Sequence, residues 1–168
     1  MDKSFSDPAP RSVPCAPAPT GTSLTAMSNW PVLLLPSLLL AVTFVFTRCP
    51  LPDYCPLMMK KFTTAHAALI ADDATRAGTH LLTVSFDTKH DTPEILRAYG
   101  EPFQKTEPPF THWELASGTE EAIRTLGGEL GLDYVEESRS FTHNLRTAVI
   151  GPDGKLVRLF RGNEWTPE

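Results

Sequence analysis

Two cysteines enclose a proline-rich stretch, residues 49–55 (Cys-Pro-Leu-Pro-Asp-Tyr-Cys), which Pro56 follows directly. The stretch joins an apolar run that ends at Phe46 to a helical pattern that begins near Pro56. Proline is unfavourable inside strands and helices, so we expect the two thiols on a strand-to-helix loop. Cysteines there can form a disulfide or bind a soft metal ion. The alternative, two small buried apolar residues, is disfavoured by the three prolines around them.

The expected position of the second thiol favours its ionised form. Cys55 should lie at or near the N-cap of the helix, with Pro56 at the first helical position, where a missing N–H costs nothing. Free N–H groups and the positive end of the helix dipole at this point are expected to lower a thiol pKa. Disulfide exchange and metal binding both require the thiolate, so the sequence leaves both open.

Length and charge narrow the class of protein. A chain of 168 residues can form one domain with a substantial core plus tails. The net charge is −5 and no Lys/Arg cluster is present, which argues against a nucleic-acid partner. Three cysteines are too few for a disulfide scaffold. Cys15 lies in a tail rich in Pro, Ser, Ala and Thr and is expected to be an incidental thiol.

The first part of the chain is expected to stand apart from the domain. Residues 1–29 are proline-rich and lack periodicity, which predicts disorder. The uncharged apolar run 30–46 is short for a membrane span of about 20 residues. Pro31 and Pro36 interrupt its first half, and the role of residues 30–37 stays open.

The second half of the apolar run is interpreted as a buried strand over residues 38–47, because it is rich in β-branched and aromatic residues. A signal peptide or membrane anchor is the alternative, since Lys3 and Arg11 supply positive charge ahead of the run. In that case, however, Cys49 would emerge at the membrane surface with no strand behind it. Membrane association therefore stays open.

The rest of the chain alternates helical and strand patterns and ends with a hairpin around Asp153-Gly154. The expected elements are a helix over 56–78 with Met58, Phe62, Ala65 and Leu69 on one face, a strand over 81–86, a helix from 91–94 to Tyr99, a strand over 110–115, a helix over 119–130 with Ala122, Ile123, Leu126 and Leu130 on one face, and strands over 147–150 and 155–160. This order predicts an α/β fold with parallel central strands and an antiparallel edge.

A strand that runs into a cysteine pair at a helix N-terminus, followed by a βαβ unit and a hairpin, resembles the thioredoxin fold. More specifically, it resembles the Sco/SenC family of copper-binding cytochrome c oxidase assembly proteins. The segments that carry the resemblance are 46–50 with 55–56, then 84–87 with 91–94, and finally 141–144 leading into 150–155. They occur in the family's order, and the resemblance covers residues 38–168.

The resemblance implies one copper ion per chain, as Cu(I) or Cu(II), bound by Cys49, Cys55 and His143. Two soft thiolates and an imidazole suit that metal independently. His143 is then expected on a loop next to the cysteine loop. Asp87 and Asp91 should lie at the same end of the sheet. We interpret Asp87 as support for the site and Asp91 mainly as a helix cap.

The other four histidines are disfavoured as ligands. His66 is expected within a helix, at the surface or at the edge of the core. His80 opens a predicted strand, and His112 lies inside another. His90 is expected near the active end of the sheet.

Three departures from the family pattern stand out. Five residues separate the cysteines, where the family usually has three, and this bears on metal affinity and redox potential. The β-rich segment that usually precedes the cysteine strand is missing. The helix start at residues 166–168 has no helix after it. We therefore interpret residues 38–168 as a thioredoxin-like Sco/SenC domain, a central sheet with flanking helices, truncated at one or both ends.

The resemblance implies a metallochaperone that exchanges copper with a cytochrome c oxidase subunit or with another copper chaperone. It places the protein in the cell envelope, on the periplasmic side of the inner membrane, although no clear export signal is visible. A thiol–disulfide reductase is the alternative, and so is a truncated, non-functional product. A peroxidase of the peroxiredoxin type is disfavoured because residues 47–49 (Thr-Arg-Cys) do not match that family's Pro-x3-Thr-x2-Cys spacing.

Overall fold

The computed structural model describes residues 38–104, 109–138 and 140–167. All of them belong to one compact unit, Val32–Glu168. The tail expected over residues 1–29, the apolar segment 30–37 and Cys15 therefore lie outside the described residues. None of the helices in the described part combines the length and apolarity that a membrane-spanning segment needs.

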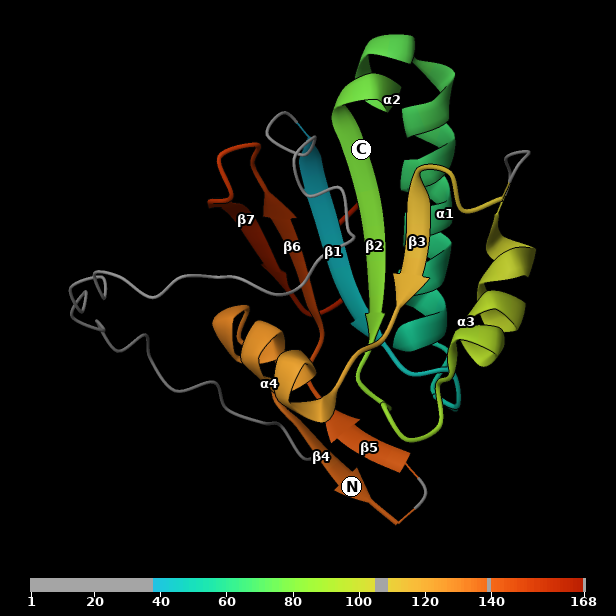
Figure 1. Cartoon of the computed structure of the whole chain (residues 1–168), viewed down its shortest axis with the longest axis vertical. Coiled ribbons are helices and arrows are strands. Elements are labelled where there is room, and N and C mark those ends of the chain that lie inside the picture. Colours follow the sequence, from blue (N-terminus) through green and yellow to red (C-terminus); the bar gives the residue numbers. More distant parts are fainter. Residues whose placement is uncertain (1–37, 105–108, 139, 168) are drawn as a thin grey trace, which may run out of the picture. The chain divides into compact units, whose positions relative to one another are not determined.

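A five-stranded mixed sheet forms the centre of the fold, in the order β3-β2-β1-β6-β7 (Figure 1). Its strands are β1 (Leu39–Val45), β2 (Thr79–Ser85), β3 (Trp113–Ala116), β6 (Arg146–Ile150) and β7 (Leu156–Arg161). The first three are parallel to one another, whereas β6 and β7 are antiparallel to their neighbours. The predicted parallel centre with an antiparallel edge is thus confirmed.

The central strand β1 agrees with the buried strand that its apolar residues predict. Its last four residues are buried, between two neighbouring strands that satisfy its backbone. The hydroxyl groups of Thr43 and Thr147 lie 3.0 Å apart across the β1–β6 pair, and Thr147 lies 4.0 Å from the sulfur of Met58. These small polar groups thus pair with one another where the sheet faces the first helix.

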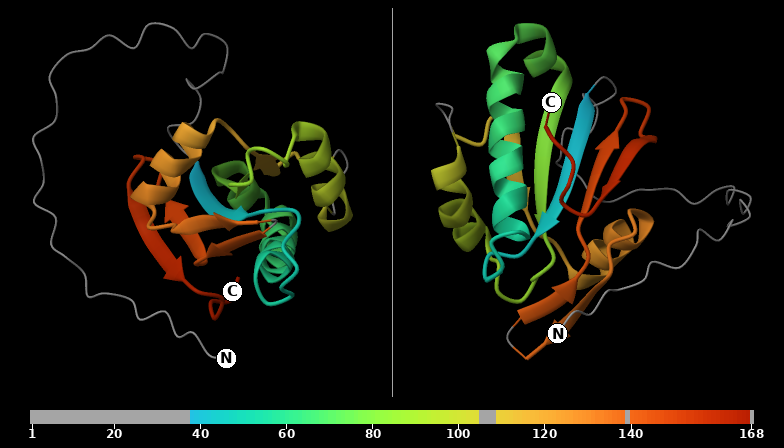
Figure 2. Two further views of the ribbon diagram at one scale, coloured as in Figure 1. Left: turned by 90° about the horizontal axis from the view of Figure 1, so that it is seen from below. Right: turned by 180° about the vertical axis from the view of Figure 1, so that it is seen from behind.

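Within the described residues, four α-helices and a 3₁₀ turn accompany the five-stranded sheet. They are α1 (Cys55–Ala71), α2 (Asp73–Gly78), α3 (Pro93–Gly100), α4 (Glu120–Glu129) and η2 (Glu101–Phe103). Helix α1 crosses one face of the sheet and lies in front of it in the view from behind (Figure 2). The single helix expected over 56–78 is in fact two helices, because the carboxylate of Asp72 accepts a hydrogen bond from the N–H of Thr75 and caps α2.

The buried face of α1 contains Met58, Phe62 and Leu69, as expected. It also contains His66, which is 0% exposed, so its predicted place at the surface or core edge is wrong. His66 follows Phe62 by four residues and therefore lies on the same face of the helix. Its ring packs edge-on against the buried ring of Trp113, with centroids 5.7 Å apart.

A second, two-stranded sheet was not foreseen. It consists of β4 (Tyr134–Glu137) and β5 (Ser140–His143), which pair antiparallel. Tyr134 and Phe141 pack against Phe86, with ring centroids 5.0 and 5.3 Å away. This small sheet, with α4, lies at the end where β1 and β2 finish (Figure 1), and β5 delivers His143 there.

The predicted C-terminal hairpin is confirmed as β6 and β7. Gly154 has a φ of 75°, a conformation that glycine adopts without strain, and the Gly151 N–H donates to the Lys155 carbonyl at 2.8 Å.

Candidate metal centre

Three metal-ligating side chains from distant parts of the sequence meet beyond the carboxyl end of β1. Cys49 lies in the loop after this strand, Cys55 is the first residue of α1, and His143 is the last residue of β5. The two sulfurs and a ring nitrogen of the histidine all lie within 4.8 Å of one another. The Cys55 sulfur is 3.9 Å from Nε2 of His143. Both cysteines are free thiols.

Backbone hydrogen bonds shape the loop that carries the cysteines. The Cys49 N–H donates to the Phe46 carbonyl at 3.3 Å, and the Tyr54 N–H donates to the Leu51 carbonyl at 3.2 Å. Tyr54 is the N-cap of α1, without a side-chain cap. Cys55 is therefore the first helical residue rather than the cap.

His143 is oriented by the residue that follows it. Its Nδ1 lies 2.8 Å from the carbonyl oxygen of Asn144. A carbonyl only accepts hydrogen bonds, so in the neutral imidazole Nδ1 carries the hydrogen and Nε2 presents its lone pair toward Cys55. The Asn144 amide is held in turn, because its Nδ2 donates to the Gly131 carbonyl at 3.2 Å and to the Asp133 carboxylate at 3.0 Å. No local sequence pattern indicates this arrangement.

Aromatic rings surround the imidazole of His143. The ring centroids of Phe46, Tyr54 and Phe86 lie 5.7, 5.5 and 5.0 Å from it, and the first two meet it edge-on. These rings limit the rotation of the imidazole and keep water from that side of the site. Nε2 is therefore presented in a fixed direction.

The two thiols have opposite electrostatic environments. The hydrogen bond from the Cys55 thiol, helped by His143 and opposed by burial, lowers the pKa of Cys49 to about 4. The hydrogen bond to Cys49 and burial both raise the pKa of Cys55. The expectation that a thiol at the helix start would have the lowered pKa is therefore wrong for Cys55, which is fully buried. These opposite shifts favour the thiolate on the half-buried Cys49 over a thiolate on Cys55.

Asp91 does not cap α3, contrary to the prediction. The cap is Thr92, whose hydroxyl accepts from the Ile95 N–H. The Asp91 carboxylate is 2% exposed and accepts from the N–H of Thr47 at 3.0 Å and from its hydroxyl at 2.6 Å. It also accepts a hydrogen bond from the Ser85 hydroxyl. Asp91 thus links Thr47, which follows β1 and lies two residues before Cys49, to Ser85 at the end of β2.

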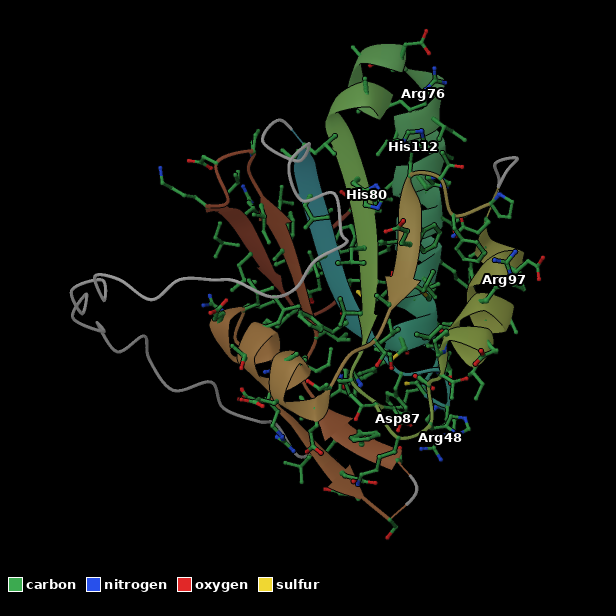
Figure 3. All side chains as sticks on the ribbon, in the orientation of Figure 1. Arg48, Arg76, His80, Asp87, Arg97 and His112 are labelled. Carbon is green, nitrogen blue, oxygen red and sulfur yellow. The ribbon has the colours of Figure 1, made fainter. Side chains whose placement is uncertain are left out.

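Asp87 binds Arg48, the residue between Thr47 and Cys49. Its buried carboxylate accepts from Arg48 Nη2 at 2.6 Å and from Nε at 3.1 Å. Figure 3 shows Arg48 and Asp87 together at this end of the sheet. The two carboxylates therefore bind the pair of residues that precede Cys49, and they bind neither sulfur in the hydrogen bonds described.

The other histidines do not join the ligand group. His80 Nε2 lies 3.3 Å from the Glu114 carboxylate (Figure 3), and His66 is buried in the core. His112 lies one residue before the start of β3, so its predicted position inside a strand is off by one residue. His90 lies in the loop before α3, where its N–H donates to the Asp87 carbonyl at 3.1 Å.

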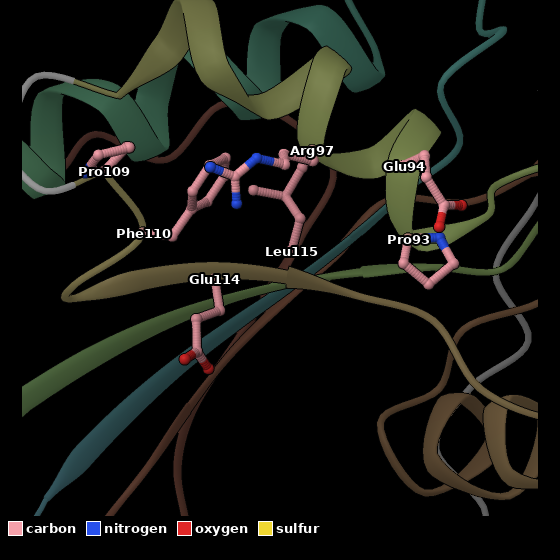
Figure 4. A pocket seen from close by; sticks show the side chains of 7 residues that line it. All are labelled: Pro93, Glu94, Arg97, Pro109, Phe110, Glu114 and Leu115. Carbon is pink, nitrogen blue, oxygen red and sulfur yellow. The ribbon is translucent and has the colours of Figure 1, made fainter.

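A surface pocket of about 380 Å³ lies between α3 and β3 (Figure 4). The Arg97 guanidinium stands over the Phe110 ring there, 5.5 Å from its centroid. The pocket is lined by none of the three ligand residues, so it is separate from the metal centre.

The donor set fits a soft metal ion. Three atoms within 4.8 Å of one another leave a point no more than about 2.8 Å from each of them, whereas bonds from a metal to sulfur or nitrogen are about 2.0–2.3 Å long. Closure thus needs movements of about half an ångström. The lowered pKa of Cys49 favours its thiolate, and the lone pair of the neutral imidazole faces the buried thiol. Copper suits such soft sulfur and imidazole ligands.

The chain matches the SCO1/SenC family model over residues 37–168. A search of curated proteins gives no match. Similar solved structures include Arabidopsis thaliana ScoI with copper bound (TM-score 0.63, 20% identity, covering 79% of each chain) and a SCO1/SenC family lipoprotein from Bacillus anthracis (0.67, 20%, covering 79% of this chain and 76% of that one). A third is BsSco (0.62, 21%, 81% and 77%), described as a member of the Sco family of cytochrome c oxidase assembly proteins with a disulfide switch. The predicted thioredoxin-like fold class is confirmed.

Proposed function

Since the chain belongs to the SCO1/SenC family, we propose that it is a metallochaperone that binds one copper ion through Cys49, Cys55 and His143. The observation that carries the proposal is the meeting of these three ligand atoms within 4.8 Å, although the histidine lies 88 positions after the second cysteine. The copper reported in Arabidopsis ScoI supports the choice of metal. The family's part in cytochrome c oxidase assembly supports an oxidase copper subunit, or another copper chaperone, as the partner.

Unequal exposure of the ligands suits delivery. Cys55 is fully buried in the first turn of α1, and His143, although half-buried like Cys49, is held between aromatic rings. Cys49 is half-buried and lies beside exposed loop residues such as Leu51, which is 50% exposed. A partner's ligands can therefore replace Cys49 first while the other two still hold the cargo. We place this exchange on the periplasmic side of the inner membrane, and the lipoprotein among the similar structures supports a location in the cell envelope.

Copper titration of the reduced full-length chain tests the proposal. We expect one ion per chain, with charge-transfer absorption from thiolate to Cu(II). His143→Ala should weaken binding at least tenfold and alter the absorption band, while the matched control His90→Ala should leave both unchanged. If His143→Ala bound copper as the wild type does, the three-ligand site would be wrong.

A thiol–disulfide reductase is the second candidate, and the asymmetry of the two thiols supports it. The Cys49 thiolate would attack a partner disulfide, forming a mixed disulfide and releasing one partner thiolate. Cys55 would then lose its proton and attack the Cys49 sulfur, which forms the Cys49–Cys55 disulfide and releases the second partner thiol. The chain loses two electrons and the partner gains them. The disulfide switch of BsSco supports such a couple.

The two candidates differ in their need for the histidine. With metal-free protein and a disulfide-linked peptide, Cys49→Ser should abolish reduction, and Cys55→Ser should trap the mixed disulfide. His143→Ala should still reduce the peptide, although it loses copper. Full reductase activity in Cys49→Ser would exclude this mechanism.

A further inference from the structure

The segment that follows β7 contacts the cysteine loop without supplying any of the three proposed ligands. The view from behind shows it running beside α1 (Figure 2). Its Asn163 donates a hydrogen bond from Nδ2 to the carbonyl oxygen of Asp53 at 2.9 Å. Asp53 lies between the two cysteines, just before Tyr54, whose ring meets that of His143 edge-on. A single side chain of the C-terminal segment thus holds the middle of the loop.

Lys61 of α1 fixes this segment in place. Its ammonium donates to the carbonyl of Asn163 at 2.6 Å and to the carbonyl of Trp165. The same ammonium lies 4.9 Å from the centroid of the Trp165 ring. That ring packs against Phe62 and Phe160, with centroids 6.3 and 5.4 Å away. Backbone, charge and apolar contacts therefore all anchor the segment to the domain.

We propose that residues 162–165 form a strap that positions the Cys49–Cys55 loop, with Asn163 and Lys61 as its positioning residues. Asp91 and Asp87 restrain the loop's entrance, at Thr47 and Arg48. The strap restrains the loop further along, at Asp53. The effect on copper rests on the proposed function, whereas the ordering of the loop does not.

The strap matters because the loop is wide. Five residues between the cysteines have more conformations to lose than three, because ordering each residue costs backbone conformational entropy. A hydrogen bond near the middle removes part of that freedom before the metal binds. One such bond contributes a factor of roughly two to ten. We expect that factor to appear in the copper affinity.

The test uses four variants of the full-length chain. Asn163→Asp keeps the shape of the side chain but removes the N–H donor. Asn163→Gln keeps an amide donor on a longer side chain. Lys61→Met removes the ammonium, and Lys60→Met is its matched control, because Lys60 is exposed on the same helix. Copper affinity is measured by chelator competition, the site by the Cu(II)–thiolate band, and the loop by hydrogen–deuterium exchange of a peptide spanning residues 49–58.

Asn163→Asp and Lys61→Met should bind copper about two- to tenfold more weakly, shift the band and speed up exchange in the loop. Lys60→Met should match the wild type, and Asn163→Gln should recover at least part of the affinity. Unchanged affinity, band and exchange in Asn163→Asp would overturn the strap, whether or not Lys61→Met folds. If the wild type bound no copper, the proposed function would fail, and loop exchange alone would decide: faster exchange in Asn163→Asp supports the strap and unchanged exchange overturns it.

Discussion

Replacing Asp91 by alanine is expected to remove the tie between β1 and β2 that holds the approach to Cys49. The buried carboxylate accepts three hydrogen bonds, two from Thr47 and one from Ser85. Alanine leaves the donors without this acceptor and opens space among buried groups. Asparagine has the same shape and keeps one oxygen, so the pair Asp91→Ala and Asp91→Asn separates the loss of hydrogen bonds from the loss of charge.

The structure gives the size of both effects. A hydrogen bond to a charged group contributes about 1.5–3 kcal/mol, so three of them would sum to more than about 4 kcal/mol. The net cost of the alanine substitution should be smaller than this sum. Thr47 is only half-buried and can turn partly to water, and the Ser85 hydroxyl can rotate. We therefore expect Asp91→Ala to cost about 3 kcal/mol. In Asp91→Asn, the oxygen can serve the Thr47 N–H and Ser85 while the amide donates to the Thr47 hydroxyl, so the cost should be about 1 kcal/mol.

Urea unfolding at neutral pH measures both values, with copper affinity measured on the folded variants. Asp91→Ala should also bind copper more weakly, because the residues before Cys49 lose their anchor. A cost below about 1 kcal/mol for alanine would show that the three bonds contribute little. Equal costs for the two variants would show that charge, rather than hydrogen-bond geometry, is what the site requires.

Three further predictions concern titration and charge. Burial lowers the pKa of His66, so the folded protein resists protonation of this ring while the unfolded chain takes up the proton. Stability should therefore fall below about pH 6.5, by up to about 2 kcal/mol at pH 5. Urea unfolding of His66→Leu should lack this fall. With a pKa of about 4, Cys49 should react with iodoacetamide at a rate that is flat between about pH 6 and 8, and mass spectrometry showing Cys55 modified first would contradict this. Arg48→Met leaves the buried Asp87 carboxylate unpaired and should cost about 2 kcal/mol, against about 1 kcal/mol for Asp87→Asn; thermal unfolding that ranks them the other way would refute this reasoning.

Local patterns were enough to predict the elements that carry the cysteines. The apolar, β-branched residues before Cys49 predicted β1, and the proline after Cys55 predicted the start of α1. The Asp-Gly turn predicted the β6–β7 hairpin, where Gly154 has the positive φ that the turn requires. These signals succeed because the forces that produce them act within a few residues.

Contacts between distant residues were not visible in the sequence. The β4–β5 hairpin was missed because its strands have four residues each and β4 is mostly exposed, so no clear alternation marks it. Asp91 was interpreted as a cap because Asp commonly caps helices, yet its partners are Thr47, which follows β1, and Ser85, which ends β2. His66 was expected at the surface or at the edge of the core, although its place four residues after Phe62 indicates the buried face of the helix.

The ligand set itself came from the resemblance, since spacing alone does not select one histidine among five. The structure explains why His143 is suitable: the carbonyl of Asn144 fixes its tautomer, and aromatic rings fix its direction. Neither property is visible in the local sequence. Every histidine is followed by a backbone carbonyl group, and the aromatic rings come from three other segments.

The wide spacing of the cysteines changes the surface of the site more than its ligands. Cys49 is fixed by its backbone bond to Phe46, and Cys55 by its place in the first turn of α1. The sulfurs therefore stay close, and the intervening residues are displaced toward solvent, where Leu51 is 50% exposed. A longer loop with fixed ends enlarges the rim that a partner meets. The hydrogen bonds of Asp91, Asp87 and Asn163 hold the loop at Thr47, Arg48 and Asp53, which suits the proposed set of three ligands.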